Sequence, residues 1–326
     1  MASTSIVGMS GRQYVRGQLL HRDQRGRDTI FKATRGGDSA PVVFNHVSDS
    51  IYKLSQRLGT EFADCHWLRM PIDYNDDEYI VVYPYFKDTM LNLVRADPDF
   101  PEGALKKALR HVGEGLREFH AKGWLHLVPL VDVKPDNIFI DWTTSADGKK
   151  TITSAALGDF GISFKPEGNT PLRTAHPVGN FMWRSPEGQT GTGVTKASDV
   201  FSFGLLCIYA LGGADFLLME NEQELAQLAA QGVRPEQAIL TRHLTYFGPA
   251  TQGLLRQVDK SWRDVLAGMS ADAVAAVQEQ PGLSFKVWGA VLGPAAVDML
   301  SQMTNPDPTV RPSMNEVMSH LWWQEL

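Results

Sequence analysis

The 326-residue sequence has little of three things. It has only two cysteines, Cys65 and Cys207, far apart in the chain, so neither a disulfide framework nor a cysteine-based zinc site is expected. Its net charge is −6, whereas a general nucleic-acid binder usually carries a basic excess. Its longest apolar run, residues 200–211, contains Ser202 and Gly204 and is too short to span a bilayer. These absences predict an intracellular protein, cytoplasmic or nuclear, that binds neither nucleic acid nor membrane.

The organisation of the chain changes near residue 86. After a tail at residues 1–13, residues 14–86 are mostly short β-branched or aromatic runs typical of strands, interrupted by one helix at 48–58 that Ser48 or Asp49 can cap. Residues 87–326 are richer in helical patterns, beginning with an amphipathic stretch at 103–121, and a hairpin is expected at 138–159. A small β-rich lobe and a larger helical lobe, with a site between them, are therefore expected.

One short segment has the residues that phosphoryl transfer needs. Asp132, Lys134 and Asn137 follow one another at spacings of two and three residues. Phosphoryl transfer needs a carboxylate to orient the attacking hydroxyl, a cation on the transferred group, and ligands for metal ions. These three residues can supply all of these roles, although the spacing alone is a weak signal.

Four further motifs follow in order. They are Leu-Gly-Asp159-Phe-Gly, Arg-Ser-Pro-Glu187, Ala-Ser-Asp199 before the apolar run, and Asn-Pro-Asp-Pro-Thr-Val-Arg311-Pro. Together with the first segment they resemble the catalytic loop, the D-F-G and A-P-E motifs, the long buried helix and the late arginine of eukaryotic protein kinases. The resemblance covers about residues 14–325 and is strong from 79 on. Three further segments, Tyr-Pro-Tyr-Phe86, Gly-Asn-Phe-Met-Trp-Arg-Ser-Pro-Glu187 and Arg-His-Leu-Thr-Tyr-Phe247, make the sequence similar to short kinase-like proteins of filamentous fungi.

The resemblance implies an α+β, bilobal kinase fold and transfer of the ATP γ-phosphoryl group to a Ser or Thr hydroxyl of a protein substrate, with Mg²⁺. Asp132 would accept the hydroxyl proton and Lys134 would neutralise the γ-phosphate. Asn137 and Asp159 would hold magnesium. Glu187 and Arg311 would form a buried ion pair, and Asp199 would anchor the catalytic loop; these three roles are structural.

The same resemblance implies a nucleotide site in the first lobe. Its residues are Gly17, Ile30, Asn45, Tyr83, Pro84 and Phe86. Pro84 has no N–H, but family members use only the carbonyl at that position, and the Phe86 N–H would serve the adenine ring. The alternative for Tyr83 is an ordinary aromatic strand residue.

Three departures weaken the expected activity. The segment that should be a glycine-rich loop has only Gly17 and Gly26. Asn45 stands where the family has a lysine, and Lys53 stands where its glutamate partner is expected. Glu61 is an alternative acid, and Lys32 or Lys53 an alternative cation. Five residues separate His126 from Asp132 where the family has one, so residues 128–131 are expected to bulge with an apolar side chain exposed.

Three functions are consistent with these observations. The first is a Ser/Thr protein kinase, and the second is a pseudokinase scaffold with weak or no phosphotransfer. The third is a small-molecule phosphotransferase of kinase-like fold. Glu187 and Arg311 argue against the third, because in the resemblance that pair builds a platform for protein substrates.

Overall fold

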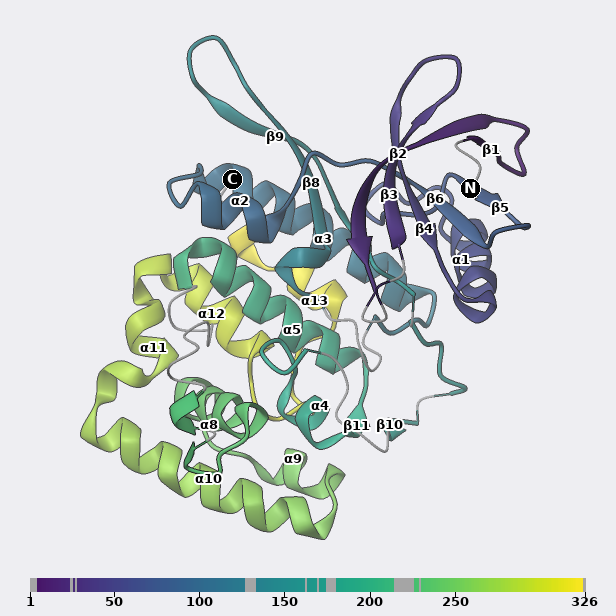
Figure 1. The fold of residues 1–326 in the computed structure, drawn as a ribbon. Coiled ribbons are helices and arrows are strands. Elements are labelled where there is room, and N and C mark those ends of the chain that lie inside the picture. The colour runs from purple at the N-terminus through teal and green to yellow at the C-terminus, as the bar shows by residue number, and fades with distance from the viewer. Residues whose placement is uncertain are drawn as a thin grey trace.

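The computed structural model describes residues 5–23, 26, 28–126, 133–161, 163–168, 170–173, 180–213, 226–228 and 230–324. It confirms the α+β fold with two lobes: a β-sheet with one helix lies at one end of the molecule, and helices make up most of the other end (Figure 1). The expected bulge at 128–131 and the catalytic candidate Asp132 lie outside the described residues.

The first lobe is built on a six-stranded antiparallel sheet in the order β1-β2-β3-β4-β6-β5. Its strands are β1 (Ser5–Val7), β2 (Gln13–Arg22), β3 (Asp28–Arg35), β4 (Pro41–His46), β5 (Asp73–Asn75) and β6 (Ile80–Pro84). The strand β1 lies in the segment expected to be a tail and pairs with β2. The helix α1 (Asp49–Glu61) follows β4 and begins at Ser48, whose hydroxyl accepts a hydrogen bond from the Ile51 N–H.

The register of this sheet assigns each strand residue to one of two faces. Phe31, Phe44 and Val82 are paired across three strands, and all are buried in a core on one face. On the other face, Lys32 pairs with Val43, which pairs with Tyr83. Because side chains alternate along a strand, the predicted nucleotide residues Asn45 and Tyr83 share this second face.

The second lobe contains most of the helices. They are α2 (Met90–Ala96), α3 (Glu102–Ala121), α4 (Pro186–Thr190), α5 (Lys196–Ile208), α8 (Pro235–Phe247), α9 (Gln252–Gln257), α10 (Lys260–Glu279), α11 (Phe285–Trp288), α12 (Pro294–Met303) and α13 (Met314–Met318). Short 3-10 or π-helical turns are η1 (Pro135–Asn137), η2 (Tyr209–Gly213), η3 (Pro281–Leu283), η4 (Gly289–Leu292) and η5 (Leu321–Gln324). The apolar helix α5 is buried along its length from Ser198 onward, as expected for a core helix. No helix of the described residues could cross a membrane.

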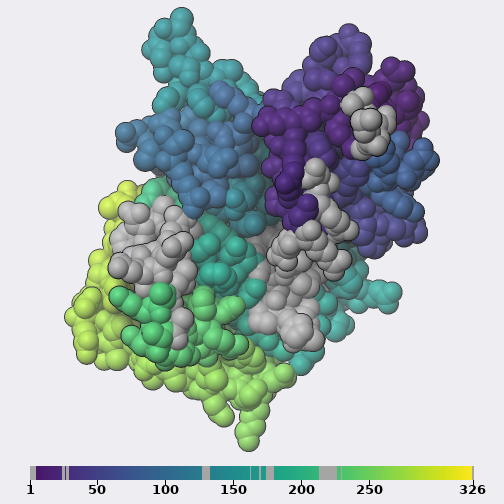
Figure 2. Space-filling model, in the orientation of Figure 1, coloured from purple at the N-terminus to yellow at the C-terminus, as the bar shows by residue number. Residues whose placement is uncertain are grey.

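Five further strands in the described residues lie after β6, in a three-stranded sheet and a separate two-stranded pair. The chain leaves β6 and passes through Tyr85, Phe86 and Lys87 to β7 (Asp88–Thr89), which pairs with β8 (Ile138–Thr144). The expected hairpin is formed by β8 and β9 (Lys150–Leu157), and its tip stands out from the surface (Figure 2). A short pair, β10 (Leu172–Arg173) with β11 (Thr192–Val194), lies in the helical lobe.

Candidate active site

The base of the β8–β9 hairpin brings Asn137 and Asp159 together. Ile138 pairs with Leu157, and the Gly158 N–H donates a hydrogen bond to the Asn137 carbonyl at 2.8 Å. Asn137 is 5% exposed, whereas Asp159 is exposed. Asp159 has a φ of 59°, a left-handed conformation that Asp tolerates better than most residues. The backbones of the two residues expected to bind metal are therefore close together at the base of the β8–β9 hairpin.

Lys134 approaches the same place from the chain just before η1. Its Nζ lies 3.9 Å from the Asp136 carboxylate, and its side chain is 21% exposed. Val133 is fully buried, which fixes the chain on the carboxyl side of Asp132. The structure thus describes Lys134, Asn137 and Asp159, but not the predicted proton acceptor.

On the amino side, His126 is held by Asp199. The Asp199 carboxylate accepts a hydrogen bond from the His126 N–H at 2.9 Å and lies 2.8 Å from Nε2 of His120. His126 Nε2 lies 3.1 Å from the Gly158 carbonyl. Burial lowers the pKa of His126 even though Asp199 opposes this, so the ring is neutral and can donate to that carbonyl. Asp199 on α5 therefore holds the backbone of His126, as expected for a residue that anchors the catalytic loop.

Glu187 and Arg311 form a buried, two-pronged ion pair. The Arg311 Nη1 and Nη2 atoms donate to the two carboxylate oxygens at 2.6 and 2.8 Å, and both side chains have no exposed surface. Ser198 donates a further hydrogen bond to Glu187 at 2.6 Å. Burial alone would raise the pKa of Glu187, but the Arg311 charge and the hydrogen bonds outweigh it, so the pKa is lowered. The pair ties α4 to the link between α12 and α13.

Gly17 is explained by the close approach of two strands. A Cβ built on Gly17 would lie 2.9 Å from the Lys32 carbonyl oxygen, too close for any other residue without a shift of β3. The register of β2 and β3 also shifts between Arg16 and Leu19. Ile30, the other predicted residue of this region, pairs with Asn45. Sheet packing therefore accounts for a glycine at position 17, whether or not phosphate approaches it.

Lys53 does not lie where the sequence suggested a partner for Asn45. Its ammonium is 2.8 Å from Asp49 on the same helix, and its side chain is 71% exposed. Ile51 lies inward instead: a Cβ built on Gly161 would be 3.6 Å from its Cγ2 atom. The helical period explains this correction, because Ile51, Ser55 and Leu58 share the inner face of α1 and Lys53 does not. An apolar residue thus faces the Asp159–Gly161 turn.

The alternative charged groups are also engaged elsewhere. Glu61 forms an ion pair with Lys165 at 2.8 Å, at the far end of α1. Lys32 lies on the face of the sheet that carries Asn45, but its Nζ packs 4.0 Å from the centre of the Tyr85 ring. In the described part of the chain, neither residue forms an ion pair beside Asn45.

The segment after β6 carries the other predicted nucleotide residues. Tyr83 faces inward on β6, and burial raises the pKa of its hydroxyl. The Pro84 carbonyl, expected to serve adenine, accepts two hydrogen bonds from Arg69, from Nε at 3.0 Å and Nη2 at 2.8 Å. Phe86 lies with its ring centre 6.0 Å from that of Phe139. Sequence reasoning missed Arg69 and Phe139; an arginine within the otherwise apolar run Trp-Leu-Arg-Met-Pro-Ile was the available signal.

The comparison with known families decides the identity of this fold. Residues 68–323, well over half of the chain, match the protein kinase domain family. The chain belongs to the protein kinase family. This match covers Lys134, Asn137, Asp159 and the Glu187–Arg311 pair, and it begins just before the strands β5 and β6 of the first lobe.

Kinases from plants and bacteria are similar to part of this kinase domain. The L-type lectin-domain containing receptor kinase S.1 of Arabidopsis thaliana is 28% identical over 152 residues, 46% of this chain and 22% of that protein. The serine/threonine-protein kinase pkn2 of Myxococcus xanthus is 31% identical over 147 residues, 44% of this chain and 16% of that protein. The serine/threonine-protein kinase drp72 of Corynebacterium efficiens is 32% identical over 135 residues, 41% of this chain and 23% of that protein. Each alignment covers less than a quarter of the relative.

The side-chain oxygens of Asn137 and Asp159 are suitable ligands for magnesium. Asn137 and Asp159 offer the oxygen ligands that Mg²⁺ prefers, and Mg²⁺ is usually bound by one or two such side chains together with substrate phosphates. In the described residues, no group of three or more His, Cys, Asp or Glu side chains could hold a metal ion. One amide oxygen and one carboxylate are donors of the kind that such a shared magnesium site takes from a protein.

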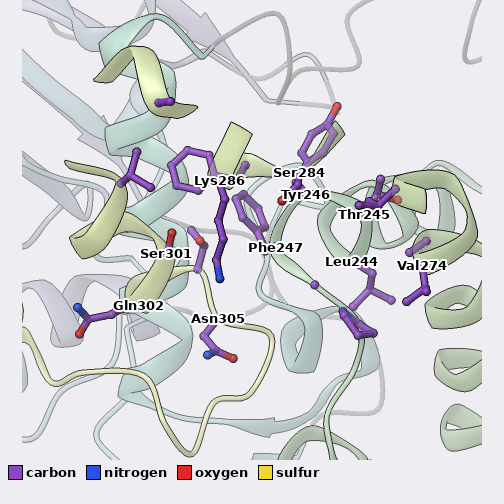
Figure 3. A pocket seen from close by; sticks show the side chains of 18 of the residues that line it. Leu244, Thr245, Tyr246, Phe247, Val274, Ser284, Lys286, Ser301, Gln302 and Asn305 are labelled. Carbon is purple, nitrogen blue, oxygen red and sulfur yellow. The ribbon is translucent and has the colours of Figure 1, made fainter. Parts of the chain in front are cut away.

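A pocket lies in the helical lobe. It has a volume of about 1070 Å³ and is lined by parts of α8, α10, α11 and α12. The Lys286 side chain extends into it towards Asn305 (Figure 3). No predicted site residue lines this pocket, so it is separate from the candidate active site.

Proposed function

We propose that this kinase domain transfers the γ-phosphoryl group of ATP, with Mg²⁺, to a Ser or Thr hydroxyl of a protein. The observation that carries the proposal is the contact between Gly158 and Asn137, which sets Asn137 and Asp159 side by side with Lys134 on the same segment. The names of two bacterial relatives, both serine/threonine-protein kinases, support the class of acceptor. The protein substrate is part of the proposal.

Each residue has a defined part in the proposed reaction. The substrate hydroxyl oxygen forms a bond to the γ-phosphorus while the bond from that phosphorus to the bridging oxygen breaks, releasing ADP. The hydroxyl proton goes to the Asp132 carboxylate. Lys134 offsets negative charge on the transferred group. Asn137 and Asp159 would hold Mg²⁺, which supplies positive charge across the phosphates when bound.

The supporting framework is consistent with a protein acceptor. The Glu187–Arg311 pair fixes α4 directly after the segment 180–185, where the family places its platform for protein substrates. Both cysteines are free and buried, which is consistent with a cytoplasmic or nuclear location. That location, and the likeness to fungal kinase-like proteins, stay predictions from the sequence.

The test is transfer of radiolabel from ATP to a generic basic protein, with and without Mg²⁺. Asp132→Asn, Lys134→Met and Asp159→Asn should each lower transfer at least 100-fold. Asp272→Asn, an exposed aspartate on α10, is the matched control and should leave transfer unchanged. Transfer that survives Asp159→Asn would contradict the proposal.

A second candidate is a kinase domain that binds nucleotide or partners without transfer. It is favoured by Asn45 and Ile51, because neither side chain carries a charge, whereas the resemblance expects a charged pair between this strand and this helix. The transfer assay and a calorimetric titration with ATP together separate the two candidates: a wild-type chain that binds ATP but transfers no more label than Asp159→Asn would support the second.

A further inference from the structure

The pocket in the helical lobe has a size that suits a small molecule. Its volume is about 1070 Å³, and pockets that bind small molecules usually have about 300–1,000 Å³. Helices α8 and α10 line one side of it, whereas α11, α12 and the residues that follow α12 line the other. Because protein interiors are densely packed, a space of this size between helices is a candidate binding site.

Residues of two separate hydrophobic cores line this pocket. Leu244 and Ala273 belong to the cluster that packs α8 against α10, and Phe285 belongs to the main core of the lobe. Further apolar side chains on its walls are those of Phe247, Val274 and Val277. An apolar chain in the pocket would contact both cores and would remove their exposed surface from water, which is favourable.

Lys286 is an unpaired charged group in this pocket. Among the described residues that line the pocket, only Lys286 and Asp298 carry a charge. The Asp298 carboxylate lies 3.0 Å from Nε2 of His320, whereas no hydrogen bond or ion pair joins the Lys286 ammonium to another described residue. The Lys286 side chain extends into the pocket (Figure 3). The pocket therefore offers an unpaired positive charge to a ligand.

Polar and apolar side chains lie on different sides of the pocket. Figure 3 shows Lys286, Ser301 and Gln302 on one side, and Leu244 and Val274 on the other. The Ser301 hydroxyl oxygen is buried, and it has no hydrogen-bond partner in the described part of the chain. Buried hydroxyls without a partner are uncommon, and an ammonium can only donate. A ligand with a negative charge and acceptor oxygens therefore suits the polar side, and an apolar chain suits the other.

We propose that this pocket binds a long-chain fatty-acid carboxylate, with the carboxylate at Lys286 and the chain against α8 and α10. A fatty acid combines the two features that the pocket requires, a single negative charge and a flexible apolar chain. The carboxylate oxygens accept hydrogen bonds from the ammonium, and the chain adapts to walls that come from several helices. The inference is independent of the proposed phosphoryl transfer, because no residue of the candidate active site lines the pocket.

Calorimetric titration of the full chain with dodecanoate and with decanoate, below the concentrations at which they form micelles, tests the pocket. We expect saturable binding of one molecule per chain. Each buried CH₂ group should tighten binding about threefold to fourfold, so dodecanoate should bind roughly tenfold more tightly than decanoate. Equal affinity for the two, or no saturable binding, would overturn the proposal. A chain that transfers label to protein but binds no fatty acid would overturn this inference alone.

The variant Val274→Trp tests the location. The larger side chain would fill part of the pocket, so the affinity for dodecanoate should fall by about tenfold or more. Val265→Trp is the matched control, because Val265 lies on the same helix and is also 39% exposed but does not line the pocket. Unchanged binding in Val274→Trp, or an equal loss in both variants, would overturn the location.

The variant Lys286→Met tests the carboxylate end. Methionine keeps an apolar stem and removes the charge, so decanoate should bind about fivefold more weakly, whereas the affinity for decanol should not change. Lys260→Met, at an exposed lysine of α10 outside the pocket, should leave both affinities unchanged. A Lys286→Met variant that binds decanoate as the wild type does would overturn the role of Lys286. The chain-length and Lys286 measurements decide the proposal even if Val274→Trp does not fold.

Discussion

Arg311 and Glu187 meet through two hydrogen bonds although 124 residues separate them in the chain. The same guanidinium also donates to the carbonyls of Ala197 and Asn305. One buried arginine therefore joins α4, the start of α5 and the link after α12. Since α4 follows the segment where the resemblance expects the protein substrate, we expect this pair to support that segment as well as the helical lobe.

Removal of one partner of this pair should be costly. We expect Arg311→Met to lower the free energy of unfolding by roughly 3–5 kcal/mol, because it leaves the Glu187 carboxylate buried and unpaired. Urea unfolding measures this directly. The double variant Arg311→Met/Glu187→Met should recover much of the loss, since no unpaired charge remains. A double variant as unstable as the sum of the single variants would contradict a direct pairing.

His243 should make stability depend on pH. Its ring is buried between Phe201 and Phe247, and neither ring nitrogen has a hydrogen-bond partner in the described part of the chain. Burial, aided by the charge of Arg242, lowers its pKa to about 3. His243 takes up a proton near pH 6.5 in the unfolded chain but not in the folded chain. The free energy of unfolding is therefore unaffected by His243 above pH 6.5 and decreases as pH falls from 6.5 towards 3.

The variant His243→Phe tests this dependence. Its unfolding free energy should exceed that of the wild type by a margin that grows as pH falls below 6.5, by at most about 1.4 kcal/mol per pH unit. Parallel urea titrations at pH 8 and pH 5 measure the margin. A difference in unfolding free energy that is the same at both pH values would contradict this account, because it would mean that His243 binds its proton as readily in the folded chain as in the unfolded chain.

A repaired ion pair should strengthen nucleotide binding. Asn45→Lys combined with Ile51→Glu should tighten ATP binding roughly tenfold, more than the two single changes together, because a charged hydrogen-bonded pair is restored beside Asp159. The matched control is Asn45→Lys with Lys53→Glu, which should match Asn45→Lys alone because Lys53 is exposed and pairs with Asp49. Calorimetry with ATP compares them. Equal gains in both double variants would contradict the placement of Ile51.

Local patterns predicted most of the elements of this fold. The Ser48 cap, the amphipathic α3 and the β8–β9 hairpin each follow from neighbouring residues. The hairpin in turn explains why Asn137 and Asp159, 22 residues apart, lie side by side. The two motifs and the hairpin between them therefore predicted that Asn137 and Asp159 lie close together, and their role as magnesium ligands stays a prediction.

Contacts that depend on the reach of one side chain were not predictable in this way. Arg69 meets Pro84 across the sheet, and no local period indicates which carbonyl a buried arginine will find. The inward position of Ile51 follows from its helical spacing with Leu58. The sequence position of Lys53 relative to Asn45 does not show which face of the helix it occupies, because that face depends on the length of the connection between β4 and α1.

The most direct test of the central claim is the effect of Mg²⁺ on thermal stabilisation by ATP in the wild type and in Asp159→Asn. A ligand at 100 times its Kd adds about 2.7 kcal/mol, which raises Tm by a few degrees in a chain of this size. If Asn137 and Asp159 hold a metal ion beside the nucleotide, Mg²⁺ should enlarge the shift in the wild type and leave it unchanged in Asp159→Asn. The same Mg²⁺-dependent shift in both proteins would contradict the account.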